Sequence, residues 1–372
     1  MVVEVAWVNG LAAIRSLGRK GLRVLAVDNR PFALGLRSRY AEARLAPDPL
    51  DDEDGFVAAL RAIADETDDV LPVFPTHDEH LNAIARHADV LGERYRFPFP
   101  SWDVLEKIQS KRHQLETADS VGVPTPRTFY PQSADEARAA GEEVGFPLIV
   151  KPSANVGFRR SHKRQLFRCE TPAELDRAYE LAAPHEPMVQ ELIPSGPEEM
   201  WTLGSYLDRD GRALGLFSGR KLSQTRGYMG SARAGEARWV DEVVEQGLAL
   251  LRALGFHGIS QVELMRDPRD GKYKLLEVNP RLWQWHSLAA ACGVDLPWIA
   301  YRDLVGDPLP PARMHGDGKR WAITLMAGSG HAIERPPYVD AVFARDDPKP
   351  ALVQLARHTL RGVRTMTGAG RG

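Results

Sequence analysis

The sequence predicts an α/β protein with α+β character in its second half, and three observations carry this prediction. Residues 2–28 contain a short apolar run, a helical pattern and a second apolar run, an order that favours neighbouring parallel strands. Asp-Gly pairs at 210–211 and 270–271 each separate two apolar runs, as expected for antiparallel hairpins. Between the hairpins, apolar residues recur at helical spacing over 240–254. Together these patterns indicate sheets that are covered by helices.

The composition is that of an ordinary globular protein with room for two or three domains. Of the 372 residues, 43% are hydrophobic and 26% are charged, and a net charge of −2 gives no bulk attraction to nucleic acid or membranes. Cys169 and Cys292 lack CxxC spacing, which argues against a disulfide scaffold or zinc site and fits a reducing compartment. No apolar run could span a bilayer, and the N-terminus has Glu4 but no basic segment of a signal peptide. We therefore expect a cytoplasmic protein.

The first 100 residues are predicted to form one α/β domain. The run "VVEVAWV" is a strand, "LAAIRSLGRKG" is a helix that stops at Gly21, and "LRVLAVD" is the next strand. The run "DVLPVFPT" (69–76) is a further strand of the same sheet. No GxGxxG pattern is present, so the sequence does not predict a dinucleotide site here.

Four polar residues follow that last run, namely Thr76, His77, Asp78 and Glu79. Open α/β sheets bind ligands at the carboxyl ends of their strands, so these residues could contribute to a site. The alternative is a polar loop that opens the next helix, and the sequence does not decide between the two.

A change of composition near residues 95–105 marks a domain boundary. A proline-rich stretch precedes a helix expected over 101–121. Capping boxes at 133–136 and 171–174 predict helices that begin at about 134 and 172. Between them, "FPLIVKPS" is a buried strand that ends on Lys151.

The chain after residue 312 is less informative. It offers one apolar run, "RWAITLMAG", then a loop rich in proline and aspartate, and a basic helix near 350–364.

The second hairpin brings two carboxylates together. If its turn centres near Asp270, Glu263 lies opposite Glu277, because both are seven residues from that centre. Two opposed carboxylates repel unless a cation lies between them, and Asn279 adds a neutral oxygen on the same face. Such hard oxygen ligands suit Mg²⁺ or Mn²⁺. Arg281, two residues further on, could hold a phosphate or carboxylate.

The alternative for this hairpin is a solvated polar face. The flanking run "VNPRLWQW" is too apolar for an outer face, which favours a cleft. Trp283, Trp285 and His286 follow the metal strand and could shape a substrate pocket, with His286 as a proton acceptor. A place in the core is an equally good interpretation of either tryptophan.

Two lysines and an acidic hinge complete the set of candidate site residues. Lys151 ends a buried strand, whereas Lys111 lies on the helix before the Gly122–Pro126 corner. The run "EPMVQELIPSGPEEM" is an apolar strand that enters a Gly/Pro hinge with three acids, Glu191, Glu198 and Glu199. Such a hinge could offer backbone groups to a purine and a carboxylate to a ribose.

The order of these segments resembles the ATP-grasp superfamily. The resemblance rests on "SKRHQLETADSVGVPTP", "FPLIVKPS", "MVQELIP" and "GISQVELMRDPRDGKYKLLEVNPR", and it covers about residues 98–310. Within the superfamily the chain looks closest to carboxylate–amine ligases of the D-aspartate ligase-like kind, through "GRKL" and "EVNPRLWQWHSLAAACGVDLP".

The resemblance implies an ATP-grasp fold preceded by a Rossmann-like pre-ATP-grasp domain. The implied divisions are a pre-ATP-grasp α/β domain (1–100), a lid subdomain (101–190), a subdomain with the metal site (191–312), and a C-terminal extension (313–372). The catalytic part would have the α+β character noted above.

The resemblance also implies a role for each candidate residue. ATP phosphates would be held by Lys111 and Lys151, the adenine by Gln190, Glu191, Leu192 and Ile193, and the ribose by Glu198 or Glu199. One or two Mg²⁺ ions would be held by Glu263, Glu277 and Asn279, with Mn²⁺ as an alternative. Arg281 and Lys221 would neutralise the transferring phosphoryl group or an acyl phosphate.

The implied activity is an ATP-dependent ligation of a small-molecule carboxylate to an amine through an acyl phosphate. Two alternatives stay open: an ATP-grasp enzyme with another acceptor, such as a small-molecule kinase or a carboxylase-like enzyme, and a nucleotide-binding module without catalysis. No nucleic-acid or membrane partner is expected. A homodimer is one assembly to consider, since the sequence does not fix the oligomeric state.

The segment after Lys151 departs from the family pattern. Many relatives carry a glycine-rich loop there, whereas "SANVGFRRSHKRQLF" has one glycine and is basic, with Arg159, Arg160, Lys163 and Arg164. It could be a lid that covers phosphates with side-chain charge, or a solvated basic loop.

Overall fold

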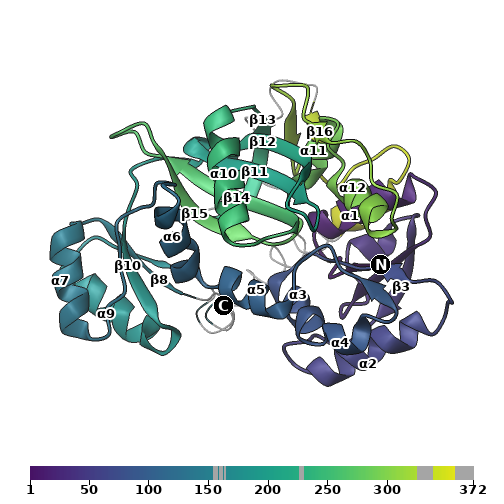
Figure 1. The fold of residues 1–372 in the computed structure, drawn as a ribbon, viewed down its shortest axis with the longest axis horizontal. Coiled ribbons are helices and arrows are strands. Elements are labelled where there is room, and N and C mark those ends of the chain that lie inside the picture. Colours follow the sequence, from purple (N-terminus) through teal and green to yellow (C-terminus); the bar gives the residue numbers. More distant parts are fainter. Residues whose placement is uncertain (154–157, 159–161, 163–164, 226–229, 325–337, 357–372) are drawn as a thin grey trace, which may run out of the picture.

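The structure is a computed structural model that describes residues 1–153, 158, 162, 165–225, 230–324 and 338–356. Three sheets, each packed with its own helices, account for most of this part of the chain. Figure 1 shows the small antiparallel sheet at one end of the molecule, the parallel sheet at the other end, and the large sheet between them. Within the described ranges, no helix is both long and apolar enough to cross a membrane.

The first sheet is parallel and has the strand order β3-β2-β1-β5. Its strands are β1 (Val2–Val3), β2 (Val24–Asp28), β3 (Ala41–Leu45) and β5 (Phe74–Pro75). Its helices are α1 (Val8–Gly18), α2 (Glu53–Ala64), α3 (Asp78–Arg86) and α4 (Ala88–Leu91), with a short turn at Gly35–Arg37. The strand predicted at 69–76 is divided: β4 (Leu71–Pro72) pairs with β6 (Tyr95–Arg96), whereas β5 joins β1 in the first sheet.

Two short helices lead from the parallel sheet to the rest of the chain. They are α5 (Trp102–Gln109) and α6 (Lys111–Ser120), where the sequence predicted one helix over 101–121. That prediction is wrong at Ser110, because this residue is extended and its side chain accepts a hydrogen bond from His113 N. Ser110 is therefore the N-cap of a new helix that begins at Lys111.

The small antiparallel sheet has the order β7-β10-β8-β9. Its strands are β7 (Thr128–Phe129), β8 (Leu148–Pro152), β9 (Phe167–Cys169) and β10 (Pro187–Glu191), and its helices are α7 (Ala134–Val144) and α9 (Pro172–Ala182), followed by a turn at Ala183–His185. The predicted helix starts at 134 and 172 are confirmed, since Ser133 and Thr171 cap α7 and α9. Leu148, Val150 and Val189 pack against these helices, so alternate residues of β8 and β10 face the other way.

The large sheet has the order β15-β14-β11-β12-β13-β17-β18, with β16 beside β12. Its strands are β11 (Met200–Leu207), β12 (Ala213–Gln224), β13 (Ala232–Ala237), β14 (Gly258–Arg266), β15 (Tyr273–Asn279), β16 (Ala312–Arg313), β17 (Arg320–Ala322) and β18 (Tyr338–Asp340). Its helices are α10 (Asp241–Ala253), α11 (His286–Ala291) and α12 (Leu296–Leu304), and a turn at Pro197–Glu199 precedes β11. Both predicted hairpins and the helix predicted at 240–254 are confirmed by β11–β12, β14–β15 and α10.

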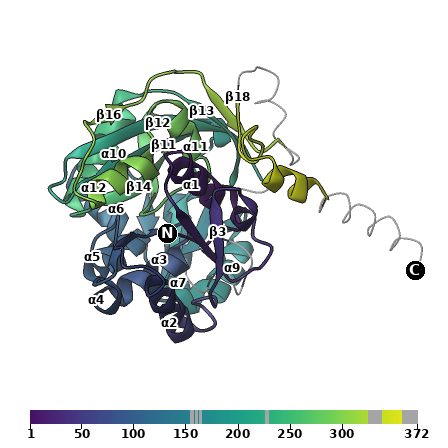
Figure 2. The same cartoon turned by 90° about the vertical axis from the view of Figure 1, so that its right-hand side faces the viewer.

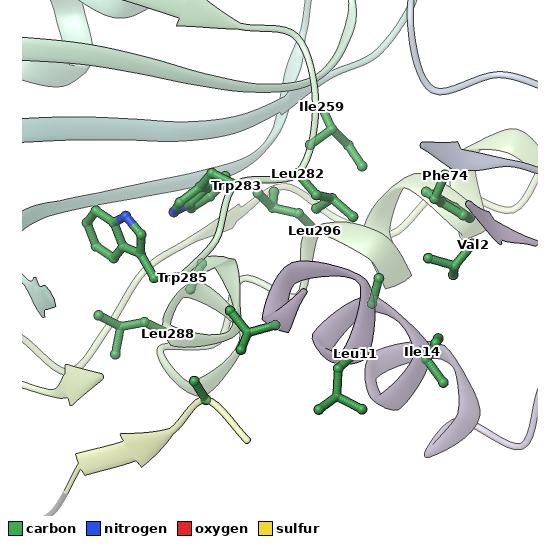
Figure 3. Packing of buried hydrophobic residues seen from close by; sticks show 14 of the residues in the cluster. Val2, Leu11, Ile14, Phe74, Ile259, Leu282, Trp283, Trp285, Leu288 and Leu296 are labelled. Atoms are coloured by element: carbon green, nitrogen blue, oxygen red, sulfur yellow. The ribbon is translucent and has the colours of Figure 1, made fainter. Parts of the chain in front are cut away.

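One continuous apolar core joins the parallel sheet to the large sheet. Figure 3 shows Leu11 and Ile14 on α1, which lies beside the helix that carries Leu288, and the same apolar cluster includes Trp283 and Trp285. A second core lies under α10, on the other face of the large sheet. After β18, Arg15 forms a buried ion pair with Asp347 and so fastens the C-terminal segment to α1. Figure 2 shows the helical residues 349–356 projecting beyond this anchor; the remainder of the basic helix predicted at 350–364 lies outside the described residues.

Candidate active site

Two carboxylates face each other on the antiparallel pair β14–β15. Glu263 is the direct partner of Glu277, and Gln261 is the partner of Asn279, as the sequence predicted for the acid pair. On the next strand, Thr202 lies beside Glu263. Gln261 Nε2 donates to Glu263 Oε1 at 3.1 Å, and Asn279 Nδ2 donates to Glu277 Oε1 at 3.3 Å. Neighbouring strands thus place one polar strip on a single face of the large sheet.

A β-bulge helps to set this pairing. Near the hairpin tip, Met265 pairs with Lys274 and Leu264 with Leu275, so Leu276 is the extra residue before the Glu263–Glu277 pair. The bulge shifts the register by one residue and brings the two carboxylates opposite each other.

Lys111 reaches the acid pair from α6. Its Nζ lies 3.4 Å from Glu277 Oε2, and its backbone N donates to Ser153 O, next to the end of β8. Gln114, one helical turn later, accepts from Val278 N and donates to Val278 O. These bonds hold α6 against β15 and so fix the distance between Lys111 and Glu277.

Lys151 is buried on β8, with only 4% of its surface exposed. Within the described chain its ammonium group has no hydrogen-bond or ion-pair partner. Burial, and then the neighbouring charge of Lys111, lower the pKa of Lys151 to about 7, while Glu277 acts in the opposite direction. A buried cation with no fixed partner is expected where an anionic ligand completes the site.

Lys221 approaches the acid pair from β12. It is buried, and its Nζ donates to Gly230 O at 3.1 Å. Burial lowers the pKa of Lys221, whereas Glu263 and Glu277 oppose that shift. Lys221 is thus the cation on the Glu263 side of the pair.

The two carboxylates respond differently to these surroundings. Burial raises the pKa of Glu263, and the negative charge of Glu277 raises it further. Burial acts on Glu277 in the same direction, but Lys111 and Lys151 outweigh it and hold the pKa of Glu277 below its usual range. Glu277 still exposes 25% of its side chain. Glu277 is therefore ionised in the ligand-free site, whereas a divalent cation would be needed to hold Glu263 fully ionised.

This donor set fits a small hard cation. It provides two carboxylates and one amide oxygen, and in the part of the chain that is described no three His, Cys, Asp or Glu side chains gather into a fuller cage. Mg²⁺ commonly binds through one or two carboxylates and keeps other positions for water and phosphate oxygens.

Arg281 connects this strip to the parallel sheet. Its Nε and Nη2 donate to Asp78 at 2.6 and 3.1 Å, and Nη2 also donates to Asn279 Oδ1 at 3.3 Å. Arg281 outweighs the effect of burial and lowers the pKa of Asp78, the first residue of α3. A small pocket between the sheets is lined by Phe74 and Pro75 from β5 and by Pro280 and Arg281.

The hinge residues after β10 have varied environments. Gln190 shares the face of Lys151, because Gln190 pairs with Ile149 and Met188 with Lys151. The Gln190 amide donates to Thr128 Oγ1 at 2.7 Å. Ile193 packs with Met200, Met265 and Leu276, which form an apolar patch beside the polar strip. Leu192 is half-buried, Glu198 is exposed, and Glu199 lies 4.0 Å from Arg266.

The Glu191 carboxylate binds cations from the β14–β15 hairpin. It accepts from Lys274 Nζ at 3.0 Å and from Arg269 Nη2 at 2.9 Å, and it also accepts from Arg127 N. This side chain therefore links the small sheet to the large one, while its backbone remains part of the hinge.

Trp283, Trp285 and His286 belong to the core. A Cβ at Gly204 would lie 2.0 Å from the Trp283 ring, and one at Gly235 would lie 2.9 Å from Trp285. His286 is 2% exposed, its Nε2 lies 3.0 Å from Asn9 O, and burial lowers its pKa to about 4. A place in the core therefore describes Trp283, Trp285 and His286 better than a substrate pocket does. Arg159, Arg160, Lys163 and Arg164 lie outside the described residues.

Comparisons with known proteins agree with this architecture. Residues 234–311 match the family model "Carbamoyl-phosphate synthase L chain, ATP binding domain". The chain is 24% identical over 240 residues to the D-aspartate ligase of Enterococcus faecium (strain Aus0004), a match that covers 61% of the chain and 57% of the ligase. The chain thus spans little more than half the length of that relative.

Solved structures show the same fold. The biotin carboxylase domain of the Hydrogenobacter thermophilus 2-oxoglutarate carboxylase, a complex with MgADP, aligns with a TM-score of 0.65 at 20% identity, over 84% of this chain and 70% of that one. The L-amino acid ligase from Bacillus licheniformis aligns with a TM-score of 0.62 at 16% identity, over 83% and 74%.

The chain is similar to ATP-grasp proteins in sequence and in fold. The predicted resemblance is confirmed, as is an α/β ATP-grasp fold. The sequence predicted the acid pair and the lysines of this site, but it did not single out Gln114, Thr202 and Gln261. Their only sequence signal was the even spacing of polar residues along the strands and the position of Gln114 one turn after Lys111.

Proposed function

We propose that this protein is an ATP-dependent carboxylate–amine ligase that forms an amide or peptide bond through an acyl phosphate and releases ADP and phosphate. The observation that carries the proposal is the opposed Glu263–Glu277 pair, which three buried lysines approach from three different elements. Opposed carboxylates bind a metal, and convergent cations bind the phosphates that share it. The similarity to D-aspartate ligase and L-amino acid ligase supports this class of reaction.

Glu263, Glu277 and Asn279 would hold Mg²⁺, with Mn²⁺ as an alternative of similar ligand preference. When bound, the metal neutralises charge on the transferring phosphoryl group. The structural neighbour with MgADP supports the assignment of ATP and magnesium.

The nucleotide would lie between the small and large sheets. Lys111 and Lys151 would bind its phosphates, which would restore full charge to the partly neutralised Lys151. Residues 190–193, namely Gln190, Glu191, Leu192 and Ile193, would line the adenine, with the apolar patch around Ile193 beneath it. Because the Glu191 carboxylate already binds cations, its backbone groups would read the base, and Glu198 or Glu199 would bind the ribose.

The chemistry begins when the substrate carboxylate attacks the γ-phosphate of ATP and gives an acyl phosphate and ADP. Arg281 and Lys221 would neutralise the developing charge, and Arg281 would exchange part of its contact with Asp78 for the ligand. An amine then attacks the acyl carbon and phosphate leaves. The site must keep water from the acyl phosphate, which otherwise hydrolyses.

The same proposal extends to the whole chain. Residues 1–100 would be a Rossmann-like pre-ATP-grasp domain, 101–190 the lid, 191–312 the subdomain with the metal site, and 313–372 an extension. The partners would be a small-molecule carboxylate and an amine, with a homodimer as the assembly to test. An ATP-consuming protein with two buried free cysteines suits the cytoplasm.

A screen of ADP release with pairs of carboxylates and amines tests the proposal. Hydroxylamine traps an acyl phosphate as a hydroxamate, so a ligase forms hydroxamate that requires ATP, magnesium and the correct acid. Glu277→Gln should abolish turnover and, because it also removes the ion-pair partner of Lys111, lower thermal stability moderately. Glu245→Gln on the exposed face of α10 is the matched control.

Other outcomes would overturn the proposal. ADP release without hydroxamate would indicate a kinase-like or carboxylase-like acceptor. ATP binding without ADP release across the panel would indicate a nucleotide-binding module. Normal turnover by the Glu277→Gln variant would remove the metal assignment.

A further inference from the structure

Glu4 has a backbone conformation that side chains other than glycine rarely adopt. It follows β1 directly, has φ = 62°, and is almost fully buried. A left-handed conformation at such a residue costs roughly 1–3 kcal/mol and persists only where the surroundings require it, often at functional sites. The contacts of the Glu4 side chain show what holds the residue in this conformation.

The Glu4 carboxylate contacts two side chains from neighbouring strand ends, Arg30 and His77. One oxygen contacts Arg30 Nη2, and the other lies 2.8 Å from His77 Nδ1. Arg30 Nε also donates to Asp28 Oδ1 at 2.9 Å. Arg30 and His77 nevertheless remain 46% and 30% exposed, so buried carboxylates fix both side chains from the inner side only.

The outer ends of these side chains are free within the described chain. Arg30 Nη1 and His77 Nε2 have no hydrogen-bond partner there. His77 Nδ1 faces the Glu4 carboxylate at 2.8 Å, although not in hydrogen-bond geometry. A proton on Nδ1 suits this negative neighbour and leaves Nε2 as the proton acceptor. The groups that face His77 are Glu4, Asp78 on its own helix, and His80, whose pKa is lowered by burial to about 4.

This cluster lies at the topological switch point of the parallel sheet. Strand β1 has β2 on one side and β5 on the other, so the chain leaves β1 in both directions. Glu4, Asp28 and Thr76 lie at the carboxyl ends of these three strands, which is where open α/β sheets bind ligands. Helix α1 also begins here, and no side chain caps its first amide groups.

Two further observations favour a ligand at this edge. Asn9, in the first turn of α1, has a buried side-chain oxygen with no partner in the described chain. Trp7 and Phe32, on the loops after β1 and β2, are exposed large apolar side chains. A charged centre with unused donors and an apolar rim fits a small molecule that has both an anionic group and an apolar part.

The edge is adjacent to the proposed acyl phosphate. His77 precedes Asp78, and Asp78 binds Arg281, which in turn contacts Asn279 of the metal strand. A ligand between Arg30 and Arg281 would therefore place its reactive group beside the phosphoryl-transfer site.

We propose that the amine substrate is an amino acid that binds at this edge, with its carboxylate on Arg30, and that His77 takes the proton from its amino group as the amide forms. This inference rests on the proposed function. Glu4 is a positioning residue, because it acts through Arg30 and His77. His286 is buried in the core and cannot serve as this proton acceptor.

The amino acid arrives as an ammonium ion, and its first proton passes to His77 Nε2. The uncharged nitrogen then forms a bond to the acyl carbon, the carbon–oxygen bond to phosphate breaks, and phosphate leaves with the electron pair and takes up the second surplus proton. The imidazolium formed in the first step is stabilised by Glu4 and returns its proton to water.

A comparison of two nucleophiles tests the role of His77. Hydroxylamine is largely uncharged at neutral pH and has no carboxylate, so it bypasses both proposed groups. His77→Asn should lower kcat with the best amino acid by about 100-fold, the lower end of what a positioned proton acceptor contributes, and leave hydroxamate formation nearly unchanged. His87→Asn is the matched control, since His87 also contacts a glutamate, Glu53, but at the opposite end of α3.

Variants of the other two residues test recognition and positioning. Arg30→Gln should raise KM for the amino acid by about tenfold, the value of one charge-assisted hydrogen bond, but not KM for the matching amine without a carboxylate. With the amino acid as substrate, Glu4→Gln should both lower kcat and raise KM. The same variant should leave hydroxamate formation unchanged.

The outcomes separate this inference from the proposed function. If the unmodified protein forms neither ADP nor hydroxamate, the proposed ligase activity fails. If it forms hydroxamate but His77→Asn lowers hydroxamate and amide formation equally, the assignment of His77 is wrong. If the best acceptor in the screen is an amine without a carboxylate, the assignment of Arg30 is wrong.

Discussion

Replacement of Lys151 by methionine should stabilise the ligand-free protein while it abolishes ATP binding. Folding lowers the pKa of Lys151 from 10.5 to about 7, chiefly by burial, so the charged lysine destabilises the folded chain. At about 1.4 kcal/mol for each pH unit between 10.5 and 7, the lowered pKa corresponds to roughly 5 kcal/mol below pH 7. Water and local rearrangement reduce such penalties, so we expect a gain of roughly 2–3 kcal/mol, because methionine fills a similar volume without charge.

The gain should depend on pH in a defined direction. A base whose pKa is lowered by folding binds its proton more weakly in the folded chain, so folding becomes more favourable as pH rises from 7 to 10.5. The difference in free energy of unfolding between Lys151→Met and the unmodified protein should therefore be largest near pH 6 and shrink towards pH 10.

Thermal unfolding with and without MgATP is the assay. Lys151→Met should have a higher midpoint than the unmodified protein at pH 6.5 and should lose the rise that MgATP causes. Lys107→Met, at an exposed position on α5, is the control and should change neither quantity. A variant that is less stable than the unmodified protein, with a difference independent of pH, would refute the reasoning that Lys151 is held in a desolvated, unpaired state.

Three further changes probe other parts of the argument. Gly204→Ala should destabilise the protein by about 1–3 kcal/mol in urea unfolding, because the added Cβ would meet the Trp283 ring; unchanged stability would show that the ring can move. Glu263→Gln should raise the unfolding midpoint of the metal-free protein above pH 7 and abolish the Mg²⁺-dependent rise with ATP, since the variant has no second carboxylate to ionise; a retained Mg²⁺ response would exclude it as a ligand. Glu191→Gln should cost about 1–3 kcal/mol in urea unfolding because it removes the buried carboxylate that binds Lys274 and Arg269 across the two sheets, and leaves both cations with Asp267; a loss within 0.5 kcal/mol, as at a typical surface position, would contradict its role as a link.

The acid pair shows how far local pattern could be used. Alternation along the strands placed Glu277 and Asn279 on one face, and the Asp-Gly turn gave the hairpin. Turn symmetry alone does not give the partner of Glu277. The strand pairs near the hairpin tip are symmetric about a point between Arg269 and Asp270, which would place Glu263 opposite Leu276. The bulge at Leu276 shifts the register by one residue and makes Glu277 the partner instead. Parity is a property of the sequence, whereas a bulge depends on packing across the sheet.

Errors in the prediction of helices have a similar cause. Periodicity over 101–121 is continuous, so it indicated a single helix. The break at Ser110 lets its side chain cap α6, and the first residue of that helix, Lys111, then reaches Glu277. A serine inside an apolar-periodic run is ambiguous between an interior position and a cap until the tertiary partner is known.

Long-range partners were beyond the reach of the sequence. Asp78 was one of four polar residues at a strand end, with two interpretations left open, and Arg281 was assigned to a ligand. Their contact joins residues 203 positions apart. The shared apolar core, in which α1 packs against α11 and α12 and which includes Trp283 and Trp285, holds the parallel sheet beside the large sheet. The tryptophans therefore serve the site indirectly, as the core that holds two sheets in register.

The contact between Asp78 and Arg281 also explains how a cationic site can exist without ligand. Arg281 is mostly buried and would destabilise the fold if its charge were unpaired. Asp78 supplies the missing anion from another sheet, and because the pair is partly exposed, an incoming phosphate or carboxylate can replace one of its two hydrogen bonds at small cost. Lys151 has no such partner in the described chain and is instead partly neutralised by its lowered pKa. Ligand binding would therefore act on the two cations differently: Arg281 would change partners, and Lys151 would take up a proton. Proton uptake on nucleotide binding without metal, measured by calorimetry in two buffers of different ionisation enthalpy, should thus be present near pH 7.5 and vanish near pH 5.5, where Lys151 is already charged in the ligand-free protein.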